Sequence, residues 1–116
     1  MNKNSTRYFS NRQEKRVAKR VSGKQTANSG ATKFSKGDVR SENWLFECKT
    51  KVKESQSITI YKDWLEKNAE EAFAMNKDYN ALVFDFGEEY NPKTYYIVDE
   101  KTFLEMKNAL EENNNE

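Results

Sequence analysis

The sequence predicts a single α/β domain in which helices flank a mixed central β-sheet. A strand pair joined by a short turn occupies residues 38–50, and two apolar runs at residues 81–86 and 95–98 have the composition of further strands. Three segments with helical periodicity, residues 10–21, 60–76 and 100–111, alternate with these strands. Such alternation favours a sheet with helices on both sides. A chain of 116 residues is the size of one domain.

The first helix is expected to begin at Ser10, because Gln13 follows it at the spacing of a capping box. Its apolar stripe consists of Val17, Ala18 and Val21. Glu14 lies one helical turn before this stripe, so the helix turns an acidic side chain toward the sheet, where it requires a cation. Alternatively, Glu14 lies at the edge of the stripe and pairs with a basic residue of its own helix.

The strand pair brings three ionisable side chains together. Asp38 follows a glycine at the start of the first strand, residues 41–43 form the turn, and residues 44–50 form the second strand. Because side chains alternate along a strand, Glu47 and Lys49 project from the same face. Two carboxylates supply oxygen ligands for Mg²⁺ or Mn²⁺, and a neighbouring lysine can hold a water or neutralise charge on phosphorus. The alternative is an ordinary charge pair on a solvated sheet face.

The residue types that are scarce in the chain limit its chemistry further. With no histidine and one cysteine, the sequence contains neither a zinc cluster nor a Ser-His or Cys-His nucleophile. Cys48 alternates with the charged residues of its strand and shares a face with Phe46, so we expect it to pack in the core. Carboxylates and lysines remain as the groups that can act in catalysis.

The later elements are predicted from periodicity and composition. Ser57 or Thr59 is expected to cap the helix at residues 60–76, and residues 57–60 are a possible short strand. The core stripe of that helix is predicted to contain Tyr61, Trp64, Leu65, Ala69, Ala72 and Phe73. Residues 22–36 have loop composition. The expected organisation is a flexible arm at residues 1–9, one domain at 10–112 and a frayed tail at 113–116.

The charge of the chain is divided between its two halves. Residues 1–53 contain 14 Lys/Arg and 4 Asp/Glu, a net charge of +10, whereas residues 54–116 contain 6 and 15, a net charge of −9. A basic half of this strength favours binding to a nucleic acid. The candidate phosphate contacts are Arg12, Arg16, Lys24, Lys33, Lys36, Lys51, Lys53 and Lys62. Lys62 is poorly placed for the helix dipole and is interpreted either as held by a phosphate or as an ordinary solvated lysine.

The spacing of Asp38 and Glu47-Cys48-Lys49 resembles the metal site of the PD-(D/E)xK nuclease superfamily, with Gly37 in place of its proline. With the segments at residues 28–31 and 36–39 added, residues 10–86 are most similar to the small Holliday-junction-resolvase-type endonucleases of archaea and phages. The resemblance implies a restriction-endonuclease-like core and one or two Mg²⁺ or Mn²⁺ ions. The implied metal ligands are Asp38, Glu47, the backbone carbonyl of Cys48 and, as a further ligand, Glu14.

The resemblance also implies an activity. Lys49 would orient or deprotonate the water that attacks a phosphodiester, and Ser29 would approach the scissile phosphate. We therefore expect a Mg²⁺-dependent endodeoxyribonuclease that acts as a homodimer on four-way junctions, in the cytoplasm and without membrane association. Three alternatives remain: a nickase, restriction- or repair-type nuclease of the same fold, a non-catalytic nucleic-acid-binding module, and a protein that binds a host factor through its acidic half.

Overall fold

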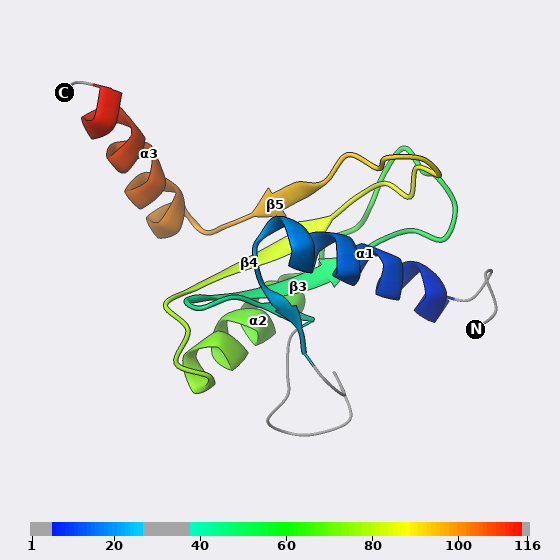
Figure 1. Ribbon diagram of the computed structural model, residues 1–116, viewed down its shortest axis with the longest axis horizontal. Coiled ribbons are helices and arrows are strands. Elements are labelled where there is room, and N and C mark those ends of the chain that lie inside the picture. The colour runs from blue at the N-terminus through cyan, green and yellow to red at the C-terminus, as the bar shows by residue number, and fades with distance from the viewer. Residues whose placement is uncertain (1–5, 27–37, 115–116) are drawn as a thin grey trace.

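A mixed β-sheet with strand order β1-β2-β3-β4-β5 lies at the centre of the computed structural model, which describes residues 6–26 and 38–114 (Figure 1). The elements in chain order are α1 (Thr6–Arg20), β1 (Lys24–Gln25), β2 (Val39–Arg40), β3 (Trp44–Lys49), α2 (Lys62–Ala74), β4 (Tyr79–Phe84), β5 (Tyr95–Ile97) and α3 (Glu100–Asn114). The expected α/β class, with helices flanking a mixed sheet, is confirmed.

The register of the sheet follows from one parallel pairing among antiparallel neighbours. β3 and β4 run parallel, with Glu47 opposite Leu82, and α2 is the crossover connection that this parallel pair requires. β2 pairs antiparallel with β3, and β5 pairs antiparallel with β4. The expected hairpin is therefore present, with its turn at residues 41–43.

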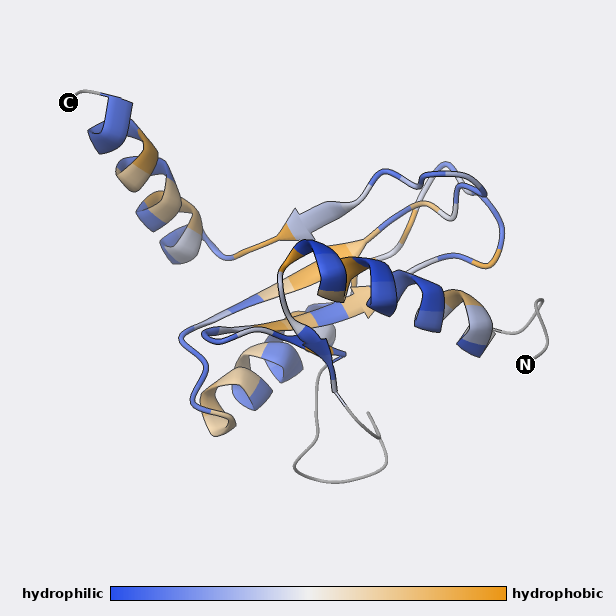
Figure 2. Ribbon diagram, viewed as in Figure 1, coloured by the Kyte–Doolittle hydropathy of each residue, from blue (hydrophilic) through white to orange (hydrophobic). Residues whose placement is uncertain are grey.

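The two faces of β3 are packed by different helices. Phe46 and Cys48 lie in the core cluster with Val17 of α1, whereas Leu45 on the opposite face is completely buried on the α2 side. The hydropathy colours agree, because the apolar residues follow β3 and β4 while the outward surface of α1 is polar (Figure 2). Cys48 is a buried free cysteine, as predicted.

The first helix differs from its predicted limits. α1 begins at Thr6, so Ser10 lies inside the helix and the predicted capping box does not form its start. The helix ends with Ser22 in a left-handed conformation (φ 56°), followed by Gly23, whose N–H donates to the carbonyl of Ala18 at 2.8 Å. A Cβ at Gly23 would collide with the carbonyl oxygen of Arg40, so glycine lets the chain pass closely under β2.

The prediction of a loop throughout residues 22–36 is wrong at its beginning. Lys24 and Gln25 form β1, which pairs antiparallel with Arg40 and Val39. Two residues of polar composition carry no strand signal, and their pairing depends on the edge that β2 offers. Residues 27–36 of the predicted loop lie outside the described part of the chain.

The predicted cap and core stripe of the second helix are largely wrong. Its N-cap is Tyr61, which makes no side-chain capping bond, so neither Ser57 nor Thr59 caps it, and residues 57–60 form no strand. Its buried residues are Asn68 and Ala72, whereas Phe73 is 85% exposed. Tyr61 and Leu65 are exposed as well. The Asn68 side-chain amide donates to the carbonyl of Ala81 at 3.1 Å, so a specific hydrogen bond to β4 turns a polar residue to the sheet.

The last helix extends away from the sheet (Figure 1). A hydrogen bond from the Tyr79 hydroxyl to Glu105, at 2.9 Å, joins α3 to β4. Its apolar residues Phe103, Leu104, Met106 and Leu110 are exposed. None of the helices in the described part of the chain combines the length and the apolar composition needed to cross a membrane.

Candidate active site

Asp38 is fixed between β1 and β3 by its backbone and by its carboxylate. Its N–H donates to the carbonyl of Phe46, and its own carbonyl accepts the N–H of Thr26, both at 3.0 Å. Its carboxylate accepts the backbone N–H of Cys48 at 2.7 Å. The side chain thereby takes the place of a strand partner for β3 and lies beside the residues that flank Cys48.

Glu47 and Lys49 project from the same face of β3, as strand alternation predicts. The Nζ atom of Lys49 lies 3.4 Å from Oε2 of Glu47 and 4.2 Å from the centre of the Trp64 ring in α2. The Lys49 side chain is only 28% exposed and the Glu47 side chain only 23%. Helix α2 covers part of this face. The alternative, an ordinary charge pair on a solvated sheet face, does not match this burial.

The pKa of Glu47 is raised to about 7, first by burial and then by the negative charge of Asp38, while Lys49 offsets part of the rise. The pKa of Glu14 in α1 is also raised to about 7, first by burial and then by the charge of Asp38. Gln25 donates to Glu14 Oε1 at 3.4 Å, which lowers this pKa in part. Asp38 therefore lies within electrostatic reach of acids from two different elements.

Glu14 forms no ion pair with any described residue, including the lysines and arginines of its own helix α1. Its predicted orientation toward the sheet agrees with the half-buried position and with the influence of Asp38. The alternative, a surface pair with a lysine or arginine of α1, does not form.

These groups fit a divalent cation that keeps part of its water shell. Across residues 6–26 and 38–114, no three acidic, cysteine or histidine side chains are close enough to hold one ion together. Mg²⁺ is commonly held by one or two carboxylates with several waters, and it does not need a closed cage. Burial is the larger cause of the raised pKa values of Glu14 and Glu47, and the negative charge of Asp38, which such a cation would neutralise, is the second.

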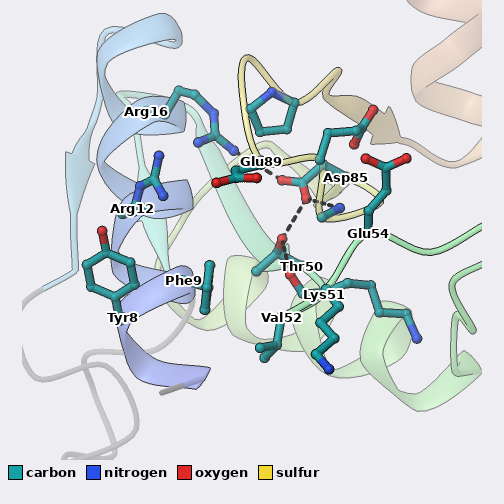
Figure 3. Close-up of a pocket in the computed structure, with 14 residues that line it drawn as sticks. Tyr8, Phe9, Arg12, Arg16, Thr50, Lys51, Val52, Glu54, Asp85 and Glu89 are labelled. Atoms are coloured by element: carbon teal, nitrogen blue, oxygen red, sulfur yellow. Dashed lines mark hydrogen bonds and ion pairs between the residues drawn. The ribbon is translucent and has the colours of Figure 1, made fainter. Parts of the chain in front are cut away.

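A cavity of about 430 Å³ adjoins the end of β3 that carries Lys49 (Figure 3). Its lining comes from α1, from the segment that follows β3 and from the loop that follows β4. Four of the residues predicted to contact nucleic acid line it, namely Arg12, Arg16, Lys51 and Lys53. The fold thus collects basic residues that are distant in sequence next to the acidic site.

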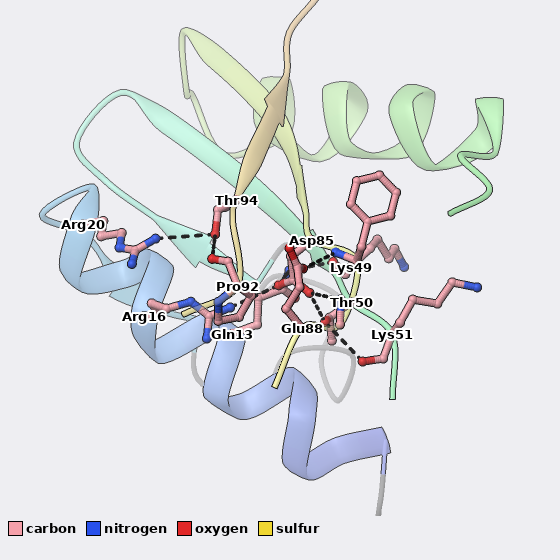
Figure 4. Close-up of polar contacts among 12 residues, drawn as sticks. Gln13, Arg16, Arg20, Lys49, Thr50, Lys51, Asp85, Glu88, Pro92 and Thr94 are labelled. Carbon is pink, nitrogen blue, oxygen red and sulfur yellow. Dashed lines mark hydrogen bonds and ion pairs between the residues drawn. The ribbon is translucent and has the colours of Figure 1, made fainter. Parts of the chain in front are cut away.

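A buried polar network joins this cavity to the acidic site (Figure 4). Asp85, directly after β4, accepts hydrogen bonds from Thr50 at 2.5 Å and Gln13 at 3.3 Å, and it pairs with Arg16 at 3.1 Å. Gln13 also donates to the carbonyl of Lys49 at 2.6 Å. The network ties α1 and β4 to the residue that carries the candidate catalytic ammonium.

Sequence reasoning missed the roles of Asp85 and Gln13. Asp85 was assigned to an apolar strand, although an acid at the end of such a run is itself a signal. Gln13 was interpreted as part of a helix cap, yet it is almost completely buried. Its position on the sheet side of α1, one residue before Glu14, was the available indication.

The remaining predicted nucleic-acid contacts are dispersed. Lys24 is exposed on β1, and Lys62 pairs with Glu66 at 3.4 Å on the outside of α2, as the interpretation of a solvated lysine requires. Ser29, Lys33 and Lys36 lie outside the described residues. Comparisons with protein-family models, with curated proteins and with solved structures gave no match.

Proposed function

We propose that the chain is a metal-dependent DNA endonuclease that hydrolyses phosphodiester bonds, with branched DNA such as a four-way junction as its substrate. The observation that carries this proposal is the position of Asp38. Its carboxylate is held by β3 at 2.7 Å, and its charge raises the pKa of both Glu47 and Glu14. Lys49 completes the group by its pairing with Glu47.

Asp38, Glu47 and the carbonyl of Cys48 would hold Mg²⁺ or Mn²⁺, with Glu14 as a water-mediated ligand. When bound, such a cation would supply Lewis-acid activation of the phosphate and would lower the pKa of a coordinated water. Lys49 donates to the attacking water or to a phosphate oxygen and offsets the charge that builds on phosphorus. Contact with Glu47 and Trp64 restricts the directions that the Lys49 ammonium can take.

Asp38→Asn and Glu47→Gln test the acidic site directly. Each variant is expected to lose Mg²⁺-dependent cleavage of a synthetic four-way junction while it keeps DNA binding, because the metal ligand is removed and the repulsion of phosphates decreases. Glu70→Gln, on the exposed surface of α2, is the matched control and should cleave normally. Near-normal cleavage by either site variant contradicts the proposal.

The choice of substrate separates the nuclease alternatives from one another. Four-way junction, flap, nicked and linear duplex DNA are incubated in parallel with Mg²⁺, and junction cleavage is the expected result. Cleavage of linear DNA alone favours the restriction- or repair-type nuclease. Salt-sensitive DNA binding without cleavage of any substrate favours the non-catalytic binding module. The absence of DNA binding favours the protein that binds a host factor through its acidic half.

A homodimer follows from the proposed substrate, because one acidic site per chain must act on two strands of a two-fold symmetric junction. The exposed apolar surface of α3 is the proposed contact, since the described chain leaves it uncovered. Leu104→Lys combined with Leu110→Lys should convert the dimer to a monomer in sedimentation experiments. A dimer that survives both changes places the contact elsewhere.

A further inference from the structure

We propose that the cavity beside Lys49 binds one unpaired nucleotide of the DNA strand that enters the acidic site. The inference rests on the proposed nuclease function and specifies which DNA structure that site accepts. Three features of the cavity carry it: an aromatic wall, a lining with both basic and acidic residues, and a direct chain connection to Lys49.

The aromatic wall is formed by the first turns of α1. Tyr8 and Phe9 line the cavity with ring centres 5.2 Å apart at 83°, so their rings face different directions. The guanidinium of Arg12 lies 5.6 Å from the centre of the Tyr8 ring. Figure 3 places these three residues together on the α1 side of the cavity. Aromatic rings backed by arginine are the platforms on which unpaired bases stack.

The cavity is lined by residues of both charges. Arg12, Lys51 and Lys53 line it, and none of them has a carboxylate within ion-pair distance among the described residues. Arg16 is already paired with Asp85. Glu54, Glu88 and Glu89 line the cavity as well. A phosphate is attracted to the basic residues, whereas the amino groups of a base can donate to the carboxylates.

The size of the cavity is sufficient for a single nucleotide. A volume of about 430 Å³ lies in the range of sites for small molecules. A base inside a duplex has both faces stacked and its edge paired, so a base can enter only where the duplex is open. Branch points and flaps offer such bases, and a continuous duplex does not.

The cavity is also next to the proposed chemistry. Thr50 and Lys51 follow Lys49 directly, and Thr50 is fixed by its 2.5 Å hydrogen bond to Asp85 at the floor of the cavity. A nucleotide held here would lie against the residue that follows Lys49, while the Lys49 side chain itself lies against Trp64 of α2. Recognition of an unpaired nucleotide would therefore position the strand for cleavage close to a branch point.

Substitutions of the aromatic wall test the inference with little disturbance of the fold. Tyr8→Leu and Phe9→Leu keep an apolar side chain but remove the aromatic ring. Tyr8→Phe keeps the ring and removes only the hydroxyl. Affinity is measured in EDTA for DNA with an unpaired nucleotide at a branch and for a fully paired duplex of equal length. Each Leu variant should bind the first DNA roughly 5- to 150-fold more weakly and the duplex unchanged. Tyr8→Phe should bind both as the wild type does.

Phe73→Leu is the control, because Phe73 is an exposed aromatic residue on α2. Equal losses for both DNAs, or no loss for either, overturn the nucleotide site. If the chain cleaves DNA in a normal, Asp38-dependent reaction and the Leu variants do not change DNA affinity, the nucleotide site is wrong and the nuclease proposal stands. If the Leu variants selectively lose affinity for the DNA with an unpaired nucleotide, but the wild-type chain cleaves no substrate with Mg²⁺, the nuclease proposal is wrong and the nucleotide site stands.

Discussion

At the scale of single residues, Asp38 organises the acidic site through one hydrogen bond. The N–H of Cys48 holds its carboxylate, and the same carboxylate then acts on its neighbours through its charge. Glu47 and Glu14 are both half-buried or more and both feel Asp38, so their pKa values rise to about 7. Such an arrangement disfavours full ionisation in the absence of a cation and favours it when a cation is present.

Glu14→Gln separates a role in catalysis from a role in stability. If Glu14 contacts the metal or its water shell, cleavage should fall roughly 10- to 100-fold with little change in folding. A residue that acted only as a helix ion-pair partner would change stability by about 0.2–0.5 kcal/mol and leave cleavage intact. Cleavage rate and melting temperature are measured on the same samples. An unchanged cleavage rate in Glu14→Gln contradicts a contact between Glu14 and the metal or its water shell.

The raised pKa values predict how stability depends on pH. Below pH 4.5, the ordinary pKa of a glutamate, Glu14 and Glu47 are protonated in both folded and unfolded chains, so they carry no penalty. Between pH 4.5 and about 7 the unfolded chain ionises first, and without metal the folded chain loses stability. Above about pH 7 the loss is complete and constant.

Melting temperatures with and without Mg²⁺ measure this effect. The wild type is compared with the double variant Glu14→Gln/Glu47→Gln, so that other titrating groups cancel. Without metal, the wild type should fall relative to the double variant from pH 5 to pH 7, and Mg²⁺ should stabilise it more at pH 8 than at pH 5. A relative rise of the wild type from pH 5 to pH 7 is the opposite of the expected sign.

At the scale of elements, one buried carboxylate connects three of them. Asp85 is 1% exposed and accepts hydrogen bonds from α1, from the residue after β3 and from the backbone N–H of Gly87 at 2.9 Å. Four donors replace the water that this carboxylate loses on folding, which makes its burial tolerable. The same bonds fix the angle at which α1 presents Glu14 to the hairpin.

Asp85→Ala should therefore destabilise the domain and disturb the site together. Removal of one partner from a buried ion pair costs about 3–5 kcal/mol, and the partial exposure of Arg16 points to the lower end of this range. Chemical denaturation measures the loss of stability. Asp78→Ala, at an exposed position in the turn before β4, is the control and should change stability by less than about 0.5 kcal/mol. A change that small for Asp85→Ala would contradict the role assigned to the network.

At the scale of the whole molecule, the two charged halves of the sequence share the sheet, because β4 of the acidic half pairs with β3 of the basic half, and they separate only at α3 (Figure 1). α1 and the hairpin, which belong to the basic half, form the acidic site and the wall of the cavity. α3, in the acidic half, extends away from the sheet (Figure 1). Under the proposed function, a DNA strand would be repelled from α3 and attracted to the basic residues of α1 and of the segment after β3.

The salt dependence of DNA binding tests this arrangement. For about six phosphate contacts, affinity should fall on the order of 10³-fold between 50 and 200 mM salt. Lys53→Gln should reduce the slope of log affinity against log salt by about 1, because one phosphate contact is lost. Lys101→Gln, on α3, should leave the slope unchanged. A flat response in the wild type shows that the basic half is not the DNA-binding surface.

The sequence by itself determined the hairpin and the common position of Asp38, Glu47 and Lys49. These features depend on local rules, since a turn sets the pairing of adjacent strands and alternation sets the face of each side chain. The same rules placed Cys48 in the core and turned Glu14 toward the sheet. Short-range periodicity is sufficient wherever a residue and its partners belong to one or two consecutive elements.

Only the tertiary structure decided how distant elements meet. The two-residue strand β1 exists because β2 offers an edge, and α2 buries Asn68 rather than Phe73 because the Asn68 amide bonds to the carbonyl of Ala81. The bonds from Gln13 to Lys49 and to Asp85 span 36 and 72 positions of the chain. Such contacts follow from the packing of whole elements, and no local pattern in the sequence encodes them.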